Sequence, residues 1–252
     1  MNELAEINRR VSWQYLFHGQ LQHGLLVLVL VPGAIALAEP GLTGGSWLGV
    51  IDRQWAYGLI AVAVIHQVLV WLLWRLQICF GTLSRWLGRA DLMVWGLVFF
   101  PLLMARPLLT AAVAASSAGT LAIPLWAAMP LAALLLGPAL YTFWSVQRYF
   151  GLLRAAGGDH FRACYWTMPL VHQGAFRYSD NAMYSFGFLA LWAIALGGRS
   201  QAALALALFQ HAYIWVHMYC TEAPDLALIY GATPPTSGPH PSAPNPLNPK
   251  HQ

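Results

Sequence analysis

Long apolar stretches separated by short polar segments dominate the chain. Four of them are long enough to cross a bilayer as helices: residues 17–38, 54–80, 91–115 and 121–150. Two shorter stretches follow at about 182–197 and 201–220, with Gly-Gly-Arg-Ser between them at 197–200. A bilayer core of about 30 Å needs about 20 apolar residues per helix, and runs of this length form helices, not strands. The pattern predicts an all-α, polytopic transmembrane helical bundle of about six spans that ends in a helical hairpin.

Composition supports the membrane assignment. Of the 252 residues, 58% are hydrophobic and 9% are charged, whereas a soluble domain carries about 25% charged residues. The basic residues stand singly, which argues against a nucleic-acid partner. Cys79, Cys164 and Cys220 form no CxxC pair and lie far apart, so we expect neither a disulfide framework nor a metal site. The sequence carries no signal for an oligomeric state.

The distribution of basic residues predicts the orientation. With six spans and a cytoplasmic N-terminus, ten Lys and Arg residues fall on the cytoplasmic side and two on the opposite side. The ten are Arg9, Arg10, Arg75, Arg85, Arg89, Arg148, Arg154, Arg162, Arg177 and Lys250, and the two are Arg53 and Arg199. Cytoplasmic segments of membrane proteins carry an excess of Lys and Arg. We therefore expect both termini to be cytoplasmic.

Arg106 precedes Pro107 within the third apolar stretch. A charge in such a place costs a few kcal/mol unless it is paired or its side chain snorkels to an interface. Two interpretations follow. Arg106 either contacts a headgroup or a cofactor, or it sits at a helix break and reaches the interface.

Composition divides the chain into three parts. Residues 1–140 hold the N-terminal transmembrane helices and carry no diagnostic motif, while residues 141–231 hold polar segments and the hairpin. Residues 232–252 contain seven prolines in 21 residues. Such a composition has little to bury and favours a disordered tail.

Residues 149–181 interrupt the apolar pattern with Arg, Asp, His and Gly among aromatic residues. Packed helices are usually joined by about two to eight residues, so a connection of this length is typical of functional or disordered segments. This one is too aromatic for disorder, and we expect a cytoplasmic cap loop over an active site. Asp180 and Asn181 are good N-cap residues for the next helix, which places Tyr184 in its first turn.

The last apolar helix carries polar residues on one side. With 3.6 residues per turn, His211, Trp215, Met218 and Glu222 share a stripe, whereas His217 lies on another face. An acid here could hold ribose hydroxyls or an amino group, and a histidine could act as a general base near neutral pH. For each histidine the alternative is a structural role in the core.

Two motifs stand on either side of the hairpin. They are Phe176-Arg177-Tyr178-Ser179-Asp180-Asn181-Ala182-Met183-Tyr184 and Glu222-Ala223-Pro224-Asp225-Leu226-Ala227-Leu228-Ile229-Tyr230-Gly231. They resemble motifs of the membrane methyltransferase superfamily that includes phosphatidylethanolamine N-methyltransferases and isoprenylcysteine carboxyl methyltransferases. The Asp-Asn form, and Tyr149-Phe150-Gly151 before the cap, resemble the phospholipid enzymes. The chain departs at Ala182, where the family has proline, and at Ala223, where it has a second glutamate.

The resemblance implies a methyltransferase core over residues 141–231 that uses S-adenosylmethionine. The cofactor would lie between the last two helices and the cap, and the methyl acceptor would enter laterally from the lipid. The implied cofactor contacts are Gly174, Arg177, Asn181, Tyr184 and Glu222. The phospholipid-like motif favours phosphatidylethanolamine, or its mono- and dimethyl derivatives on the way to phosphatidylcholine, as the substrate.

Methylation of an amine needs a base, and two other kinds of side chain can assist it. A base must remove a proton from the ammonium group, aromatic faces can hold the growing cation, and a cation can hold the lipid phosphate. The candidate bases are His211, His217, Asp180 and His172; the candidate aromatic contacts are Trp215, Tyr219 and Tyr184; the candidate phosphate contacts are Arg148, Arg162 and Arg177.

Other functions remain open at this point. The same cofactor could methylate a thiol or an isoprenoid carboxylate, and a neighbouring architecture is a membrane reductase that uses NADPH. Outside enzymes, the chain could be a transporter or a structural subunit. A transport path should place polar groups near the membrane midplane, whereas here they collect at one face, which disfavours transport.

Overall fold

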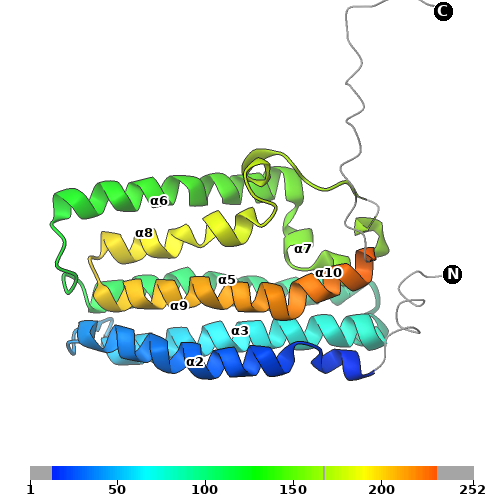
Figure 1. The fold of residues 1–252 in the computed structure, drawn as a ribbon, viewed down its shortest axis with the longest axis horizontal. Coiled ribbons are helices and arrows are strands. Elements are labelled where there is room, and N and C mark those ends of the chain that lie inside the picture. The colour runs from blue at the N-terminus through cyan, green and yellow to red at the C-terminus, as the bar shows by residue number, and fades with distance from the viewer. Residues whose placement is uncertain (1–12, 167, 232–252) are drawn as a thin grey trace, which may run out of the picture.

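The computed structural model describes residues 13–166 and 168–231, which form a bundle of helices lying side by side (Figure 1). In the view of Figure 1, α6 and α8 lie uppermost, α5 and α9 lie in the middle, and α2 and α3 lie below. The main helices are α2 (Gln20–Ala38), α3 (Asp52–Phe80), α5 (Asp91–Ser116), α6 (Leu125–Ser145), the shorter α8 (Leu189–Gly197) and α9 (Gln201–His217).

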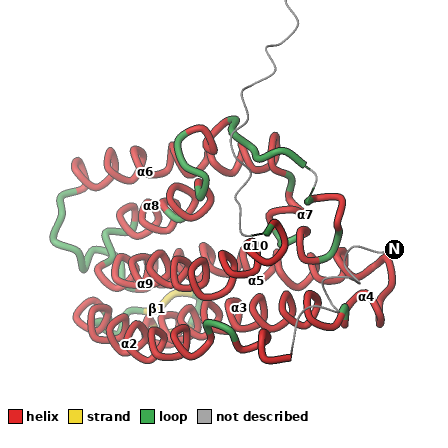
Figure 2. Tube along the Cα trace, turned by 45° about the vertical axis from the view of Figure 1, so that its right-hand side comes forward, coloured by secondary structure: helices red, strands yellow, loops and turns green. Residues whose placement is uncertain are grey.

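Short elements fill the connections, and Figure 2 shows how little of the chain is strand. The strands β1 (Ser46–Trp47) and β2 (Val50–Ile51) form an antiparallel pair. The short α-helices are α4 (Thr82–Leu87), α7 (Leu152–Ala155) and α10 (Ala223–Tyr230). The 3-10 turns are η1 (Trp13–Phe17), η2 (Glu39–Gly41), η3 (Gly88–Ala90), η5 (Gly158–His160), η6 (Ala163–Tyr165) and η7 (Gly174–Arg177). Three turns are π-helical: η4 (Val146–Phe150), η8 (Met183–Gly187) and η9 (Met218–Glu222).

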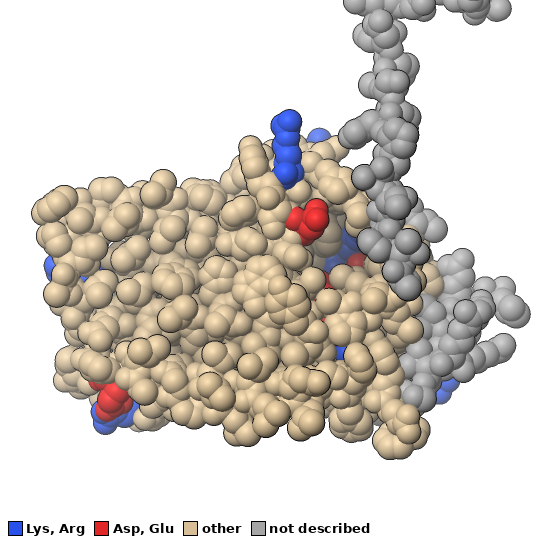
Figure 3. Space-filling model, viewed as in Figure 1, with Lys and Arg blue, Asp and Glu red and all other residues tan. Residues whose placement is uncertain are grey.

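The first four predicted spans correspond to helices that are candidate membrane spans by length and composition. Helices long and apolar enough to cross a bilayer cover Trp13–Gly41, Asp52–Phe80, Thr82–Ser116 and Leu125–Phe150. Met183–Gly197 is a shorter apolar helix. On the face drawn in Figure 3, uncharged residues cover most of the surface and only a few charged side chains appear. The described part of the chain is therefore almost entirely helical, as expected for an integral membrane protein, and the total of six spans stays a prediction.

Small residues let the helices approach closely. The largest buried cluster includes eight alanines from α2, α3, α5, α8 and α9, all at most 4% exposed: Ala34, Ala38, Ala56, Ala63, Ala114, Ala195, Ala202 and Ala203. In a membrane, packing of small residues is a main source of helix association, because lipid tails are as apolar as the helices. This packing fixes α9 against both α2 and α8.

The hairpin of α8 and α9 lies where the sequence predicts it. α8 ends at Gly197 and α9 begins at Gln201. The Ser200 hydroxyl caps α9 by accepting a hydrogen bond from the Ala203 backbone N–H. The predicted disordered tail, together with Arg9, Arg10 and Lys250, lies outside the described residues.

Candidate active site

Two π-helical turns bring the two sequence motifs together. Tyr184 lies on η8, just before α8, and Glu222 is the last residue of η9, just after α9. The Tyr184 hydroxyl donates a hydrogen bond to the Glu222 carboxylate. Isolated π-helical turns occur frequently at functional sites. The contact between one residue of each motif marks the candidate site.

Aromatic rings continue from this contact along the hairpin. The Trp215 ring lies edge-on to Tyr184 with their centroids 6.1 Å apart, and it stacks on Tyr219 at 5.9 Å. One turn earlier on α9, the His211 ring stacks on Phe188 at 5.6 Å. Tyr219 is exposed and the other four are half-buried. The side of α9 that bears His211 and Trp215 therefore faces the first motif.

The two candidate histidines of α9 lie in different surroundings. The Trp192 indole N–H donates to His211 Nδ1 at 3.1 Å. With that acceptor occupied, a neutral His211 carries its proton on Nε2 and presents a hydrogen-bond donor. His217 is buried, edge-on to Trp74 of α3 at 5.6 Å between centroids. Of the two, His211 is the one beside the first motif.

Asp180 and Asn181 precede the π-helical turn η8, and neither side chain caps it. The Asn181 carbonyl accepts hydrogen bonds from the backbone N–H groups of Tyr184 and Ser185, while the Asp180 side chain is exposed. No side chain caps η8, so the prediction that Asp180 or Asn181 acts as a capping side chain is wrong. Arg177 is also exposed. Asp180 and Arg177 are therefore accessible from outside the bundle, whereas Asn181 is half-buried.

Gly174 has a structural reason to be glycine. Its φ is +62°, and a Cβ there would lie 2.4 Å from Ser145 Oγ and 3.0 Å from the Tyr149 ring. The Ser145 hydroxyl also accepts a hydrogen bond from the Ala175 backbone N–H at 2.9 Å. These contacts dock the end of the predicted cap on α6.

Gly174→Ala is expected to destabilise the protein by about 1 to 3 kcal/mol, because the added methyl meets Ser145 in a strained backbone conformation. Unfolding of the detergent-solubilised protein by heat or denaturant measures this. Gly137→Ala is the control, since Gly137 lies within α6 and an added Cβ there meets nothing within 4 Å. Equal stability of the two variants would contradict the docking role of Gly174.

The candidate phosphate contacts differ in availability. Arg148 is exposed, with its guanidinium 5.5 Å from the centroid of the Tyr149 ring. Arg162 forms an ion pair with the buried carboxylate of Asp91 and donates to the Arg89 carbonyl at 3.2 Å. Arg162 therefore already has a carboxylate partner that the sequence did not reveal.

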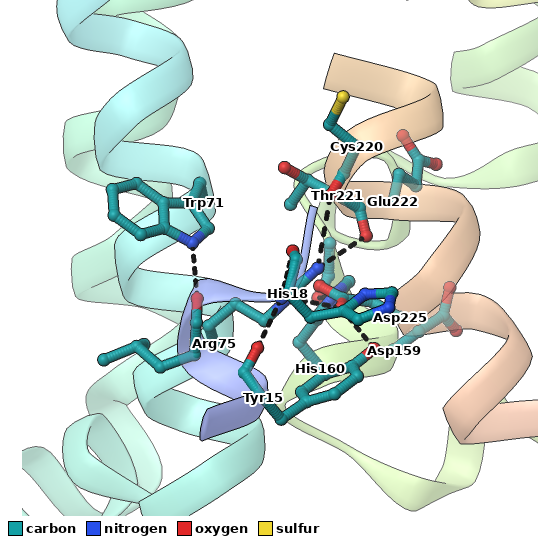
Figure 4. A network of polar contacts seen from close by, with 12 residues as sticks. Tyr15, His18, Trp71, Arg75, Asp159, His160, Cys220, Thr221, Glu222 and Asp225 are labelled. Carbon is teal, nitrogen blue, oxygen red and sulfur yellow. Dashed lines mark hydrogen bonds and ion pairs between the residues drawn. The ribbon is translucent and has the colours of Figure 1, made fainter. Parts of the chain in front are cut away.

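A buried network that the sequence did not suggest holds the second motif in place (Figure 4). Arg75 Nε lies 2.5 Å from Asp225 Oδ1, and both side chains are fully buried. Tyr15 donates to the same carboxylate at 2.9 Å, and His160 Nε2 lies 3.3 Å from its other oxygen. Arg75 also donates to the Tyr15 and His18 carbonyls at 2.6 and 3.0 Å. The network ties α10 to α3, to η1 and to the predicted cap.

A second acid fixes the other end of α10. The Tyr230 hydroxyl donates to Asp159 at 2.9 Å, and Arg154 Nε lies 3.6 Å from the same oxygen. Burial, together with the nearby Asp159, raises the pKa of Tyr230 to about 12, so the hydroxyl stays a donor. Asp225 and Tyr230 thus attach the helix that follows Glu222 at two points.

The family model described as phospholipid methyltransferase matches residues 125–233. This region runs from the start of α6 past the end of α10 and contains both motifs and the Tyr184–Glu222 contact. The match confirms the resemblance to the membrane methyltransferase superfamily, and it implies a membrane methyltransferase. Comparisons with curated proteins and with solved structures give no match.

Proposed function

We propose that the protein transfers a methyl group from S-adenosylmethionine to the amine of phosphatidylethanolamine or of its mono- and dimethyl derivatives. The observation that carries this proposal is the hydrogen bond between Tyr184 and Glu222 beside a half-buried aromatic face. It lies within the part of the chain that matches the phospholipid methyltransferase family.

The residues at this contact suit S-adenosylmethionine. The Glu222 carboxylate can accept hydrogen bonds from ribose hydroxyls, and the faces of Trp215 and Tyr219 can hold a sulfonium cation. Tyr184, Asn181 and the backbone from Gly174 to Arg177 complete the proposed site. When bound, the cofactor supplies a methyl group on a positively charged sulfur.

On the acceptor side the main task of the protein is to position the amine in line with the methyl group. Asp180 is our preferred base, because it is exposed and lies in the turn four residues before Tyr184. His211 is better suited to donate from Nε2, and His217 lies against Trp74. Among the surface cations Arg148 and Arg177 are open to an approaching lipid headgroup, whereas Arg162 is left outside the site because Asp91 holds it.

The proposed site faces the cytoplasm, with residues 149–181 as its cap and both chain ends on the same side. The excess of Arg at the end that carries both motifs supports this orientation. Labelling of single cysteines introduced at Gly44 and Tyr178 in intact cells and in inverted vesicles tests the orientation.

Binding of S-adenosylmethionine is expected to weaken as the pH falls from neutral toward the ordinary carboxyl range. Burial raises the pKa of Glu222, although the Tyr184 hydrogen bond opposes part of this. Glu222 is therefore protonated at a higher pH than an ordinary carboxyl group, and its protonated form accepts fewer hydrogen bonds from the cofactor. Calorimetry of wild type and Glu222→Gln across this range measures the effect. A Glu222→Gln profile as steep as that of wild type would contradict it.

Expression in a host that lacks phosphatidylcholine, followed by lipid analysis, tests the proposed function directly. We expect mono-, di- or trimethylated phosphatidylethanolamine to appear, and a Tyr184→Ala variant to produce none. If a radiolabelled methyl group reaches thiols or isoprenoid carboxylates but never lipid, the acceptor is wrong. If wild type does not bind S-adenosylmethionine, the methyltransferase proposal fails.

A further inference from the structure

Arg106 is buried inside a membrane-length helix. It lies on α5, within the candidate span Thr82–Ser116, and is 2% exposed. Its Nε donates to Gln210 Oε1 at 3.0 Å, and Nη2 donates to the Gln210 carbonyl at 3.4 Å. The alternative that Arg106 snorkels to an interface is therefore wrong, because the side chain points into the bundle toward α9.

The charge of Arg106 lacks a counterion. The buried Arg75 and Arg154 lie 2.5 and 3.6 Å from the carboxylates of Asp225 and Asp159. Among the described residues, none of the ion pairs involves Arg106; its partners are the neutral Gln210 and the Phe188 ring. A cation buried at membrane depth without an anion is costly, and such residues commonly mark ligand pathways.

Arg106 lies at the deep end of the proposed site. Its guanidinium carbon is 4.9 Å from the centroid of the Phe188 ring, and this ring stacks on His211 at 5.6 Å. Phe188 is one helical turn beyond Tyr184, and His211 is one turn before Trp215. Along the hairpin, Glu222 and Tyr184 are followed by the rings of Trp215, Phe188 and His211, and Arg106 of α5 lies against the Phe188 ring.

We infer that Arg106, supported by Gln210, binds the phosphate of the phospholipid whose amine is methylated. This inference rests on the proposed function. A guanidinium can hold two oxygens of a phosphodiester at once, and the half-buried Phe188 ring lies over the cation. The headgroup amine of a lipid held there points along the aromatic rings toward Tyr184. The carboxylate of S-adenosylmethionine is also an oxyanion that a guanidinium can bind, and the experiment distinguishes this carboxylate from the lipid phosphate.

The test measures lipid binding, not methylation. Full-length protein in detergent is titrated with dihexanoyl phosphatidylethanolamine and, in parallel, with dihexanoylglycerol, which lacks the phosphate, and tryptophan fluorescence is followed. Arg106→Gln is expected to bind the phospholipid at least about tenfold more weakly, since charged hydrogen bonds are lost. Its affinity for dihexanoylglycerol and for S-adenosylmethionine should not change. Arg199→Gln, at the opposite end of α8, is the control and should bind like wild type.

Two outcomes overturn the inference. If Arg106→Gln loses affinity for S-adenosylmethionine and keeps that for the lipid, the oxyanion is the cofactor's carboxylate. If neither affinity changes in a folded variant, the arginine is structural. If Arg106→Gln does not fold, Arg106→Lys is the variant to measure. Lysine keeps the positive charge but cannot form the bidentate hydrogen bonds of a guanidinium, so we expect about threefold weaker phospholipid binding. If wild type binds the lipid through its phosphate but does not bind S-adenosylmethionine, the proposed function is wrong and the inference about Arg106 still holds.

Discussion

Replacing Glu222 by Gln is expected to weaken binding of S-adenosylmethionine by about tenfold to a hundredfold. The substitution keeps the shape of the side chain and removes its charge, and hydrogen bonds to charged groups contribute about 1.5 to 3 kcal/mol. Glu222 receives the Tyr184 hydrogen bond and is attached to a helix whose position Asp225 and Tyr230 fix. The loss should therefore fall on the ligand and leave the fold intact.

Tyr184→Phe separates the two members of the contact. It removes one hydroxyl and keeps the ring against Trp215, so we expect a smaller loss of about three- to tenfold. Calorimetric titration of detergent-solubilised protein measures both variants. Tyr57→Phe is the control, because Tyr57 is an exposed tyrosine near the N-terminal end of α3, away from the proposed site. Wild-type affinity in Glu222→Gln would remove this carboxylate from the cofactor site.

The helices and one face of the site could be predicted because each depends on residues close together in the sequence. Apolar runs set the long helices to within a few residues, and Gly197 and Ser200 mark the hairpin turn. The helical period places His211 and Trp215 on one side of α9, and that side does meet Tyr184. The two sequence motifs also indicate the functional region, since both lie within the residues that the family model matches.

The buried ion pairs could not be predicted in this way. Arg75 meets Asp225 across about 150 residues of sequence, and Arg162 meets Asp91 across about 70. Nothing local marks either pairing, since it arises only when the predicted cap and α10 pack onto α3 and α5. The sequence alone makes Arg162 a phosphate candidate, because it is a predicted cytoplasmic arginine. Its partner comes from another helix.

The π-helical turns escape sequence reasoning for a related reason. The turn at η9 inserts its extra residue between Trp215 and Glu222, where the sequence shows no glycine or proline. Such turns are frequent at functional sites, and here η8 and η9 each contain one of the two residues in contact, Tyr184 and Glu222. The same holds for Arg106, whose burial depends on Gln210 of a helix about 100 residues away.

Breaking the buried pair at Asp225 is expected to lower stability more than any other single change considered. Asp225→Asn keeps the volume of the side chain but leaves Arg75 charged and fully buried, and removing one partner of such a pair costs about 3 to 5 kcal/mol. The hydrogen bond from Tyr15 can survive, since the amide oxygen still accepts it. Denaturant unfolding in detergent micelles measures the change in the free energy of unfolding.

Two further variants show whether the loss comes from the uncompensated charge. Glu39→Gln breaks the exposed pair with Arg53, and we expect a loss of at most about 1 kcal/mol, because solvent screens surface pairs. The double variant Arg75→Met, Asp225→Leu removes both charges and should be more stable than Asp225→Asn, since no unpaired ion remains. Because the pair anchors the helix that follows Glu222, Asp225→Asn should also reduce S-adenosylmethionine affinity. If the double variant is stable yet still binds weakly, the pair positions Glu222 in addition to holding the fold; if it binds like wild type, the pair serves stability alone.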